Sequence, residues 1–454
     1  MAKSEKTISG FSKLSKRGKI KWIVENFFKD PEAVTQELVS YWHGNADQQK
    51  VLDGFSENTI SNFPMPYGVA PNMVINDKTY CVPMVIEESS VVAAASSAAK
   101  YWMNRGGFKT EVISTTKIGQ VHFIWKGDSQ KLTEFFAASK AALLEDVSEL
   151  TCSMEGRGGG VKEIELLDFT AEKEHYYQLK GYFETCDSMG ANFINSVLEA
   201  LAAAWSKRIK MNKAFNANEQ EVEIVMSILS NYTPDCIVRA SVSCPVSDLD
   251  PALNEEEKLA LAKRFESAVQ IAHIDPSRAT THNKGIFNGV DAVVLATGND
   301  FRAIEACGHT YASKTGKYRS LSYCEVKDEV FKFWLDLPLA IGTVGGLTKL
   351  HPMAKRSLDM LGNPNAEELM QIIAATGLAQ NFAAIKSLVT TGIQKGHMKM
   401  HLLNILNHLE ASEKEAELTL EYFKERVVSF SGVRSFLNNQ RGIKSVPTRV
   451  HITK

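Results

Sequence analysis

Residues 118–125 read IGQVHFIW, and this stretch decides how we interpret the middle of the chain. Its alternating character is typical of a strand with one buried face. Four segments follow, helical at 129–147, strand-like at 161–169 and 176–185, and helical again at 188–208. The order strand, helix, strand, strand, helix is that of a split βαβ, ferredoxin-like unit. We therefore predict a small inserted domain over residues 116–230.

On the N-terminal side of this unit, the chain begins with helical patterns. Residues 12–26 and 31–42 carry apolar residues at spacings of three and four. Residues 58–70 contain several prolines and a glycine, so we expect an irregular segment there. An apolar run at 80–86 predicts a buried strand, and the Ala- and Ser-rich residues 91–104 predict a tightly packed helix.

On the C-terminal side, the patterns indicate a larger body. Residues 254–272 predict a helix with a charged face, and 366–389 and 398–428 also have helical periodicity. The strand candidates in this part are the short apolar or alternating segments at 236–243, 292–295, 318–326 and 331–335.

The composition is that of ordinary soluble globular domains. The chain has 454 residues, of which 44% are hydrophobic and 23% charged. Its 51 basic and 53 acidic residues leave a net charge of −2, which argues against a nucleic-acid partner. No apolar run approaches the roughly 18 residues that span a bilayer, and the basic N-terminus lacks the apolar core of a secretory signal. We expect no membrane partner.

Seven cysteines are scattered along the chain without a CxxC pair. An odd and dispersed set is typical of a reduced, cytoplasmic protein, and it offers neither a disulfide framework nor a zinc site. We therefore expect a cytoplasmic protein without a metal. The GxGxxG, GxxxxGK[ST], HExxH and GxSxG motifs are also absent, so a standard Rossmann dinucleotide site is not supported.

Two clusters of polar residues lie in apolar surroundings, where ionisable groups are costly unless paired and are therefore functional candidates. Glu87 and Glu88 follow the apolar residues 82–86, although a helix N-terminus would explain them too. Residues 277–289 (SRATTHNKGIFNG) offer Arg, His, Lys and two Asn in what we interpret as one loop. This density of donors suits an anion or a developing oxyanion, and a solvated loop is the alternative.

Two further clusters and two glycine-containing turns complete the set. Asp300 follows the apolar residues 292–295, where it could act as a helix N-cap. His397 lies beside glycines that suggest a hinge, although a lone histidine is often structural. Residues 187–192 (DSMGAN) precede a long helical segment, whose positive end could receive a phosphate while Asp187 caps it. Residues 342–349 form the second turn, and a plain structural role is open for both.

Taken together, these segments resemble class II, bacterial-type 3-hydroxy-3-methylglutaryl-coenzyme A reductases. No single segment is specific, but the set follows the order of the family over roughly residues 10–430. The matching segments are 57–60 (ENTI), 82–90 (VPMVIEESS), 157–160 (RGGG), 187–192, 277–289, 296–300 (ATGND), 344–352 (VGGLTKLHP), 377–381 (GLAQN) and 392–398 (GIQKGHM).

The resemblance implies an α+β fold in three parts. A large, mostly helical domain made of residues 1–115 and 231–391 would bind the acyl-CoA. The ferredoxin-like domain at 116–230 would bind NADH or NADPH. Residues 392–454 would form a helical flap and tail. The family forms homodimers or higher homo-oligomers with the active site at the subunit interface.

The resemblance also implies a two-step reduction of 3-hydroxy-3-methylglutaryl-CoA to mevalonate and coenzyme A, or the reverse oxidation. Lys284 would stabilise the oxyanion that forms at each hydride transfer. Glu88 would donate a proton to the aldehyde oxygen, which requires enough burial to keep it protonated. Asp300 would lie between them and couple their protonation. His397 would protonate the coenzyme A thiolate.

The remaining site residues are also carried over from the family. For the acyl group these are Ser90, Arg278, Thr281 and Asn288, with Gln380 on the coenzyme A side. For the dinucleotide they are Asp187, Met189, Gly190, Ala191 and Asn192, with Asn231, Gly345 and Gly346 as helpers.

Two departures leave questions open. Ser89 stands where the family often has proline. No acidic residue for the ribose of NAD can be assigned, and Arg157 is only a nearby candidate for a 2′-phosphate, so the choice between NAD and NADP stays open. The alternative functions are a non-catalytic acyl-CoA or nucleotide-binding protein on the same fold, or another CoA-linked enzyme that needs no nicotinamide.

Overall fold

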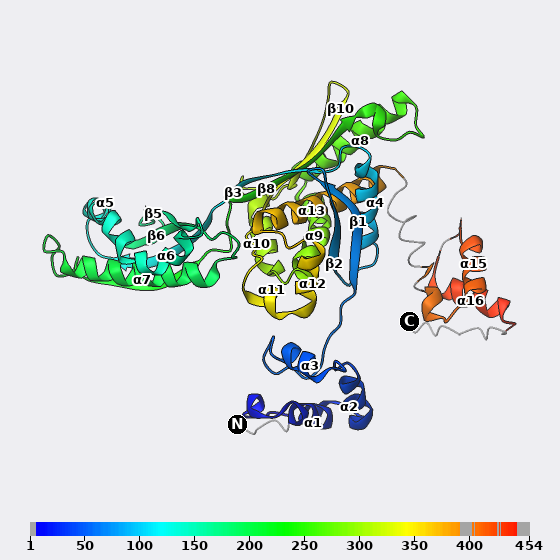
Figure 1. The fold of residues 1–454 in the computed structure, drawn as a ribbon, viewed down its shortest axis with the longest axis horizontal. Helices are drawn as coiled ribbons and strands as arrows, with labels where there is room; N and C mark the ends of the chain where they lie inside the picture. The colour runs from blue at the N-terminus through cyan, green and yellow to red at the C-terminus, as the bar shows by residue number, and fades with distance from the viewer. Residues whose placement is uncertain (1–5, 391–401, 404, 425, 427, 443–454) are drawn as a thin grey trace, which may run out of the picture.

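The protein is described by a computed structural model over residues 6–390, 402–403, 405–424, 426 and 428–442. Figure 1 shows a central body, a small domain to its left, one helical group below it and another to its right. The N-terminal group contains η1 (Phe11–Lys13), α1 (Lys16–Phe27), α2 (Pro31–Ser40) and α3 (Ala46–Asp53). The C-terminal group contains α15 (Glu413–Tyr422) and α16 (Phe430–Gln440).

The small domain is a four-stranded antiparallel sheet covered by helices. The strand order is β5-β6-β4-β7, which is the ferredoxin-like arrangement in which the first strand of the unit, β4, pairs with the third and the fourth. Its elements are β4 (Lys117–Trp125), α5 (Ser129–Asp146), α6 (Ser148–Glu155), β5 (Gly160–Asp168), β6 (Tyr176–Glu184), α7 (Ala191–Met211) and β7 (Val222–Leu229).

The alternation along β4 explains why this strand is central. Val121, Phe123 and Trp125 are fully buried on the face that the helices cover. They join a core that contains Trp205 of α7, and Trp205 contacts Phe123 edge to face. On the same strand, a Cβ at Gly119 would lie 2.6 Å from Leu198, so only glycine lets α7 pack this closely.

The central body contains two antiparallel sheets. The first is a hairpin of β1 (Tyr67–Ile75) and β2 (Lys78–Val85). The second has the order β3-β8-β10-β9 and consists of β3 (Lys109–Thr115), β8 (Cys236–Pro245), β9 (Ser322–Lys327) and β10 (Val330–Pro338). The short η2 (Val246–Asp248) follows β8. The helices of this body are α4 (Val91–Met103), α8 (Glu255–Ile274), α9 (Pro276–Ala296), α10 (Phe301–Ala312), α11 (Gly346–Leu350), α12 (Pro352–Met360) and α13 (Ala366–Val389).

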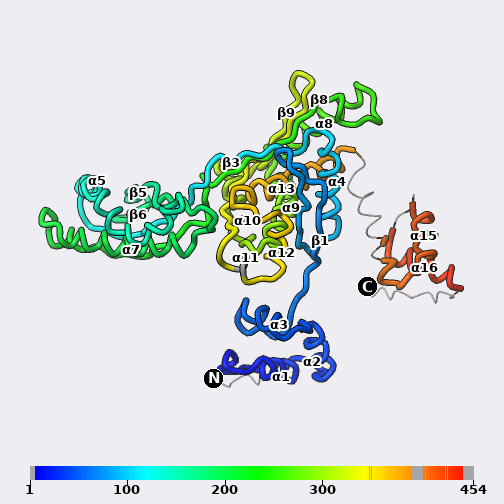
Figure 2. The backbone as a smooth tube through the Cα atoms, viewed as in Figure 1, coloured from blue at the N-terminus to red at the C-terminus, as the bar shows by residue number. Residues whose placement is uncertain are grey.

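Helices α9 and α13 pack against each other at the centre of the body (Figure 2). They cross at two glycines, because a Cβ at Gly289 would lie 2.8 Å from Gln380 and one at Gly377 would lie 2.8 Å from Val290. Within the described residues, α13 is the one helix long and apolar enough to cross a membrane, and 67% of that window is buried in the protein. The sequence-based statement that no apolar run of this length exists was therefore wrong, but this helix is a core element.

Three local predictions were wrong. Residues 292–295 were predicted as a strand and 277–289 as a loop, and both belong to α9. A short apolar run does not distinguish a buried strand from a buried helix, and the polar residues before it concealed the helical period. Residues 58–70 were predicted as irregular, although β1 begins at Tyr67 and bends at a register shift between Ala70 and Met73. All seven cysteines are free.

Candidate active site

Glu88 and Lys284 form an ion pair between two elements that are distant in the sequence. Glu88 lies in the turn between β2 and α4, and Lys284 lies on α9, which packs against β2. Lys284 Nζ donates to Glu88 Oε2 at 2.7 Å. In the single chain, the side chain of Lys284 is 59% exposed and that of Glu88 is 41% exposed. The expectation that Glu88 is buried is therefore not met within one chain.

Helix α9 carries polar residues on two faces, one at the site and one towards the core. Arg278, Thr281, Lys284 and Asn288 follow one another at spacings of three and four and therefore share a stripe. His282 and its neighbour Asn283 point into the core, where His282 Nε2 lies 2.6 Å from Ser322 Oγ. Burial lowers the pKa of His282 to about 3, so this imidazole is neutral and structural.

Two polar side chains, Arg278 on this stripe and Ser90 at the start of α4, have no hydrogen-bond partner among the described residues. The guanidinium of Arg278 is half-buried and makes no hydrogen bond or ion pair within the described part of the chain. Burial lowers its pKa, although a guanidinium stays charged at neutral pH. Ser90, which begins α4 with a φ of 76°, has a buried Oγ without a hydrogen-bond partner. Such groups are typical of a site that receives a ligand.

Gln380 is a third polar residue with a side-chain atom that has no hydrogen-bond partner. It lies on α13 where this helix crosses α9, and its side chain is 5% exposed. Its Oε1 is buried without a hydrogen-bond partner. Ser90 and Gln380, both predicted to contact the substrate, thus each have a buried side-chain oxygen without a hydrogen-bond partner.

The structure does not place Asp300 between Glu88 and Lys284. Asp300 is the N-cap of α10 and accepts hydrogen bonds from the backbone N–H groups of Arg302 and Ala303. Both of its carboxylate oxygens also accept from the guanidinium of Arg302, at 3.0 Å each. Among the described residues, the hydrogen bonds and ion pairs of Asp300 are all within its own helix, so its predicted position between Glu88 and Lys284 stays a prediction. The N-cap explanation, which the sequence left open, is correct.

The turn before α7 brings the predicted cofactor residues together at the domain junction. Gly190 is the N-cap of α7 with a φ of 93°, and Ala191 and Asn192 form its first turn. A Cβ at Gly190 would lie 2.5 Å from Thr185, so the turn requires glycine. Asp187 does not cap α7 as predicted. Its Oδ1 accepts from the N–H of Ala366 at 2.8 Å, at the start of α13.

The second predicted turn lies beside the first. The N–H of Thr343 donates to the carbonyl of Asp187 at 2.9 Å, and Ser188 forms a parallel bridge with Val344. Gly345 and Gly346 follow, with φ values of 82° and 54°, at the start of α11. A Cβ at Gly342 would lie 2.5 Å from Met189 N, so the two turns are in close contact.

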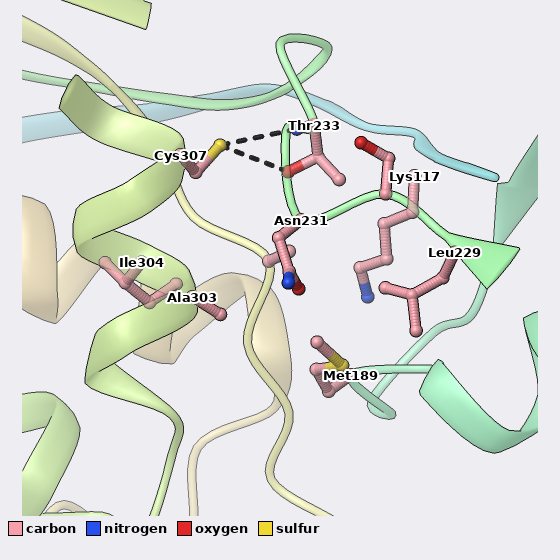
Figure 3. Close-up of a pocket in the computed structure, with 10 residues that line it drawn as sticks. Lys117, Met189, Leu229, Asn231, Thr233, Ala303, Ile304 and Cys307 are labelled. Carbon is pink, nitrogen blue, oxygen red and sulfur yellow. Dashed lines mark hydrogen bonds between the residues drawn. The ribbon is translucent and has the colours of Figure 1, made fainter. Parts of the chain in front are cut away.

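A small cavity lies at this junction (Figure 3). It is lined by the predicted residues Met189 and Asn231 and by Lys117, which sequence reasoning missed. The only signal for Lys117 was a lysine at the start of a strand whose next residues are mostly apolar. Asp291 on α9 was also missed, and its Oδ1 is buried without a hydrogen-bond partner. Burial and the neighbouring Glu305 carboxylate raise the pKa of Asp291 to about 8.

Two further predictions concern residues or groups beyond this geometry. His397 lies outside the described residues. Among the residues that the structure describes, no group of three or more His, Cys, Asp or Glu side chains could hold a metal ion. The described part of the candidate site offers one ammonium–carboxylate pair, a guanidinium and a glycine-bearing helix N-terminus.

Comparison with known proteins identifies the class to which this arrangement belongs. The family model for hydroxymethylglutaryl-coenzyme A reductase matches residues 19–402. The chain is 37% identical over 420 residues to the 3-hydroxy-3-methylglutaryl-coenzyme A reductase of Archaeoglobus fulgidus, covering 91% of this chain and 90% of the relative. It is 32% identical over 430 residues to a probable reductase of the same name from Borreliella burgdorferi, covering 93% and 95%. The chain belongs to the hydroxymethylglutaryl-coenzyme A reductase family.

Solved structures agree with this assignment. A class II 3-hydroxy-3-methylglutaryl-CoA reductase from Streptococcus pneumoniae, bound to NADPH in open conformations, matches with a TM-score of 0.69 at 36% identity and covers 84% of this chain. Another structure of the reductase from this organism matches with a TM-score of 0.70 over 96% of the chain. Both solved chains are covered completely. The protein thus belongs to class II of this reductase family, and it is an oxidoreductase that reduces hydroxymethylglutaryl-CoA to mevalonate.

Proposed function

We propose that the Glu88–Lys284 pair is the reaction centre of this reductase. The observation that carries the proposal is the 2.7 Å contact between an ammonium and a carboxylate, on a stripe of α9 that also carries the unpartnered guanidinium of Arg278. Reduction of a thioester to an alcohol takes two hydrides and two protons and releases a thiol. The nicotinamide cofactor supplies the hydrides when it is bound. The protein must supply the protons and stabilise negative charge.

Lys284 is suited to the charge. An ammonium is a compact cation with three donors, so it can hold the carbonyl oxygen as negative charge develops and still contact Glu88. Glu88 is suited to proton transfer, because its carboxyl group contacts Lys284 and would lie beside the same oxygen. Asp300 would join them only after it leaves Arg302, because both of its oxygens are engaged there.

The acyl group would be held by the residues around this pair. Arg278 can bind the terminal carboxylate of the substrate through two parallel hydrogen bonds. Thr281 and Asn288 lie on the same stripe of α9, and the unpartnered Oγ of Ser90 lies in the turn that follows Glu88. Gln380 would contact the coenzyme A side. His397 would protonate the departing thiolate, a task that suits an imidazole near neutral pH.

The dinucleotide would bind across the domain junction. The N–H groups at the start of α7 can bind phosphate, because the positive end of the helix favours anions. Met189, Gly190, Ala191 and Asn192 form this end of the helix and the turn before it. Asn231 and the Gly345–Gly346 turn approach from the other domain. The reductase from Streptococcus pneumoniae with NADPH bound supports a nicotinamide cofactor, and NADH remains to be compared.

We further propose that the active enzyme is a homodimer in the cytoplasm. Open carboxylate and ammonium groups interact weakly in water, and a second chain over Glu88 and Lys284 would exclude solvent and strengthen their interaction. Light scattering of the purified protein tests this, and twice the mass of one chain at micromolar concentration is the expected result. A protein that is fully active as a monomer contradicts the proposal.

The reaction itself is tested by the near-ultraviolet absorbance of the reduced cofactor, with hydroxymethylglutaryl-CoA as substrate and with NADH and NADPH in separate assays. Oxidation of two cofactors for each coenzyme A released is the expected result. The ratio of the two rates decides the cofactor preference. Substrate binding without any oxidation would favour the non-catalytic alternative on the same fold.

A further inference from the structure

Lys117 is a buried cation at the junction of the two domains (Figure 3). It is the first residue of β4, and it is 4% exposed. Its Nζ donates to Thr185 Oγ1 at 2.5 Å and to the carbonyl of Ser188 at 2.7 Å. Both acceptors belong to the turn 185–190, which leads into α7. The ammonium therefore lies directly behind the segment that we assign to the cofactor.

The turn does not need this lysine to satisfy its own polar groups. Thr185 Oγ1 itself donates to the carbonyl of Ser188 at 2.6 Å, and the N–H of Ser188 donates to the carbonyl of Thr185 at 3.0 Å. An apolar residue at position 117 would thus leave no acceptor of the turn without a partner. Burial of an ammonium costs free energy that these two bonds only partly offset. A cation that the fold can do without indicates a binding role.

The position of the ammonium suits an anionic ligand. Gly190 packs against Thr185, so the N-terminus of α7 and the ammonium contact the same side chain. The positive end of a helix and a cation behind it add their attraction for phosphate. Lys117, Met189 and Asn231 also line the same small cavity, and an ammonium has a third donor beyond the two used here.

We propose that Lys117 is a positioning residue for the nicotinamide dinucleotide. It adds positive charge behind the N-terminus of α7, where the turn 185–190 would receive the phosphates. The inference rests on the proposed function, which assigns this turn to the cofactor. It concerns affinity for the dinucleotide, and the hydride transfer itself occurs elsewhere, at Lys284 and Glu88.

The groups around Lys117 define a pH dependence. Burial lowers the pKa of Lys117, whereas the nearby Glu184 and Asp187 carboxylates raise it, as Cys236 and Cys186 would do only as thiolates. Burial raises the pKa of Cys236 to about 12 and also raises the pKa of Cys186, so both thiols are neutral at physiological pH. Dinucleotide affinity should therefore decline with rising pH earlier than an exposed lysine would allow.

The test is the affinity of the full-length protein for NADPH and for NADH, measured by the fluorescence of the reduced nicotinamide. Lys117→Met should raise the Kd of the preferred dinucleotide about ten-fold, with an unchanged or higher melting temperature and a smaller change in kcat. Its affinity should no longer decline at alkaline pH. Lys117→Arg, which keeps the charge, should restore part of the affinity. Lys117→Gln replaces Lys117→Met if the latter does not fold.

Lys162→Met is the matched control. The Lys162 ammonium also donates to a threonine hydroxyl, that of Thr116 at 2.8 Å, but it is an exposed residue and its bond goes to the neighbour of Lys117 and not to the turn. This variant loses the same charge and should bind the dinucleotide like the wild type. Wild-type affinity in Lys117→Met overturns the inference, and so does a loss of affinity that accompanies a lower melting temperature. A wild-type protein that binds neither dinucleotide overturns the proposed function and this inference with it.

Discussion

Lys284 Nζ lies 2.7 Å from Glu88 Oε2, although 196 positions separate the two residues in the chain. The contact exists because α9, which carries Lys284, packs against β2, and Glu88 lies in the turn after that strand. Nearby, Asp300 is held by Arg302 instead of joining the pair. The chain therefore pairs two of the three acid–base groups that we assign to one centre, and the third is engaged with Arg302.

Replacement of Lys284 by Ala should abolish hydride transfer while substrate still binds. Lys284 is the cation proposed to stabilise the oxyanion, while Arg278, the other cation of α9, is proposed to bind the substrate carboxylate. Without Lys284, kcat should fall by at least about 10³-fold. Cofactor oxidation measures kcat, and calorimetry with hydroxymethylglutaryl-CoA measures binding. Lys109→Ala is the matched control, because Lys109 forms an exposed ion pair of the same 2.7 Å length with Asp77. Near-normal turnover in Lys284→Ala would refute the assignment.

Asp300→Asn and Arg302→Ala should have different effects. Asparagine is as good an N-cap as aspartate, so Asp300→Asn should melt within ~2 °C of the wild type. Its kcat should nevertheless fall by about 10²-fold if the carboxylate serves as an acid–base group. Arg302→Ala removes only the group that holds Asp300, and its kcat should change less than ten-fold. If the two variants lose equal activity, the ion pair has the functional role and the proposed role of Asp300 is wrong.

His397→Ala should impair the thioester half of the reaction more than the aldehyde half. The imidazole is proposed to protonate the thiolate, and free mevaldehyde has no thiolate to release. The rate with hydroxymethylglutaryl-CoA should fall by about 10²-fold, while the rate with mevaldehyde should stay within a few-fold of the wild type. Equal damage to both substrates in the same absorbance assay would argue against this role.

Asp291 should make the stability of the fold depend on pH. Burial raises the pKa of Asp291 from its ordinary 3.8 to about 8, so the folded protein keeps a proton that the unfolded chain releases. The resulting stabilisation is complete below about pH 4 and is lost as the pH rises towards 8. Asp291→Asn should therefore gain in melting temperature relative to the wild type as the pH increases from 5 to 9, by ~1–3 °C overall. Unfolding scans across this range measure the difference.

Asp47→Asn is the control for this prediction. Asp47 is an exposed aspartate in the first turn of α3, and its replacement should give the same small difference from the wild type at every pH. A difference between Asp291→Asn and the wild type that stays constant from pH 5 to 9 would show that Asp291 does not hold the additional proton.

The sequence predicted features that depend on neighbouring residues better than features that depend on contacts between distant segments. The ferredoxin-like order followed from strand and helix periodicity, since the alternation at Val121, Phe123 and Trp125 directly records which face is buried. The set of candidate residues followed from the resemblance. In contrast, residues 277–289 were interpreted as a loop. Their polar residues lie on two faces of one helix, so no single polar face shows in the sequence. His282 faces the core and Lys284 faces the site.

The sequence by itself determined the family, the ferredoxin-like unit and the identity of the acid–base candidates, because these are properties of residue type and local spacing. Only the tertiary structure decided which of them meet. It paired Glu88 with Lys284, turned Asp300 to Arg302 and Asp187 to α13, and placed Lys117 behind the cofactor turn. The physical reason is that hydrogen bonds and burial depend on packing between distant segments, which no local pattern specifies.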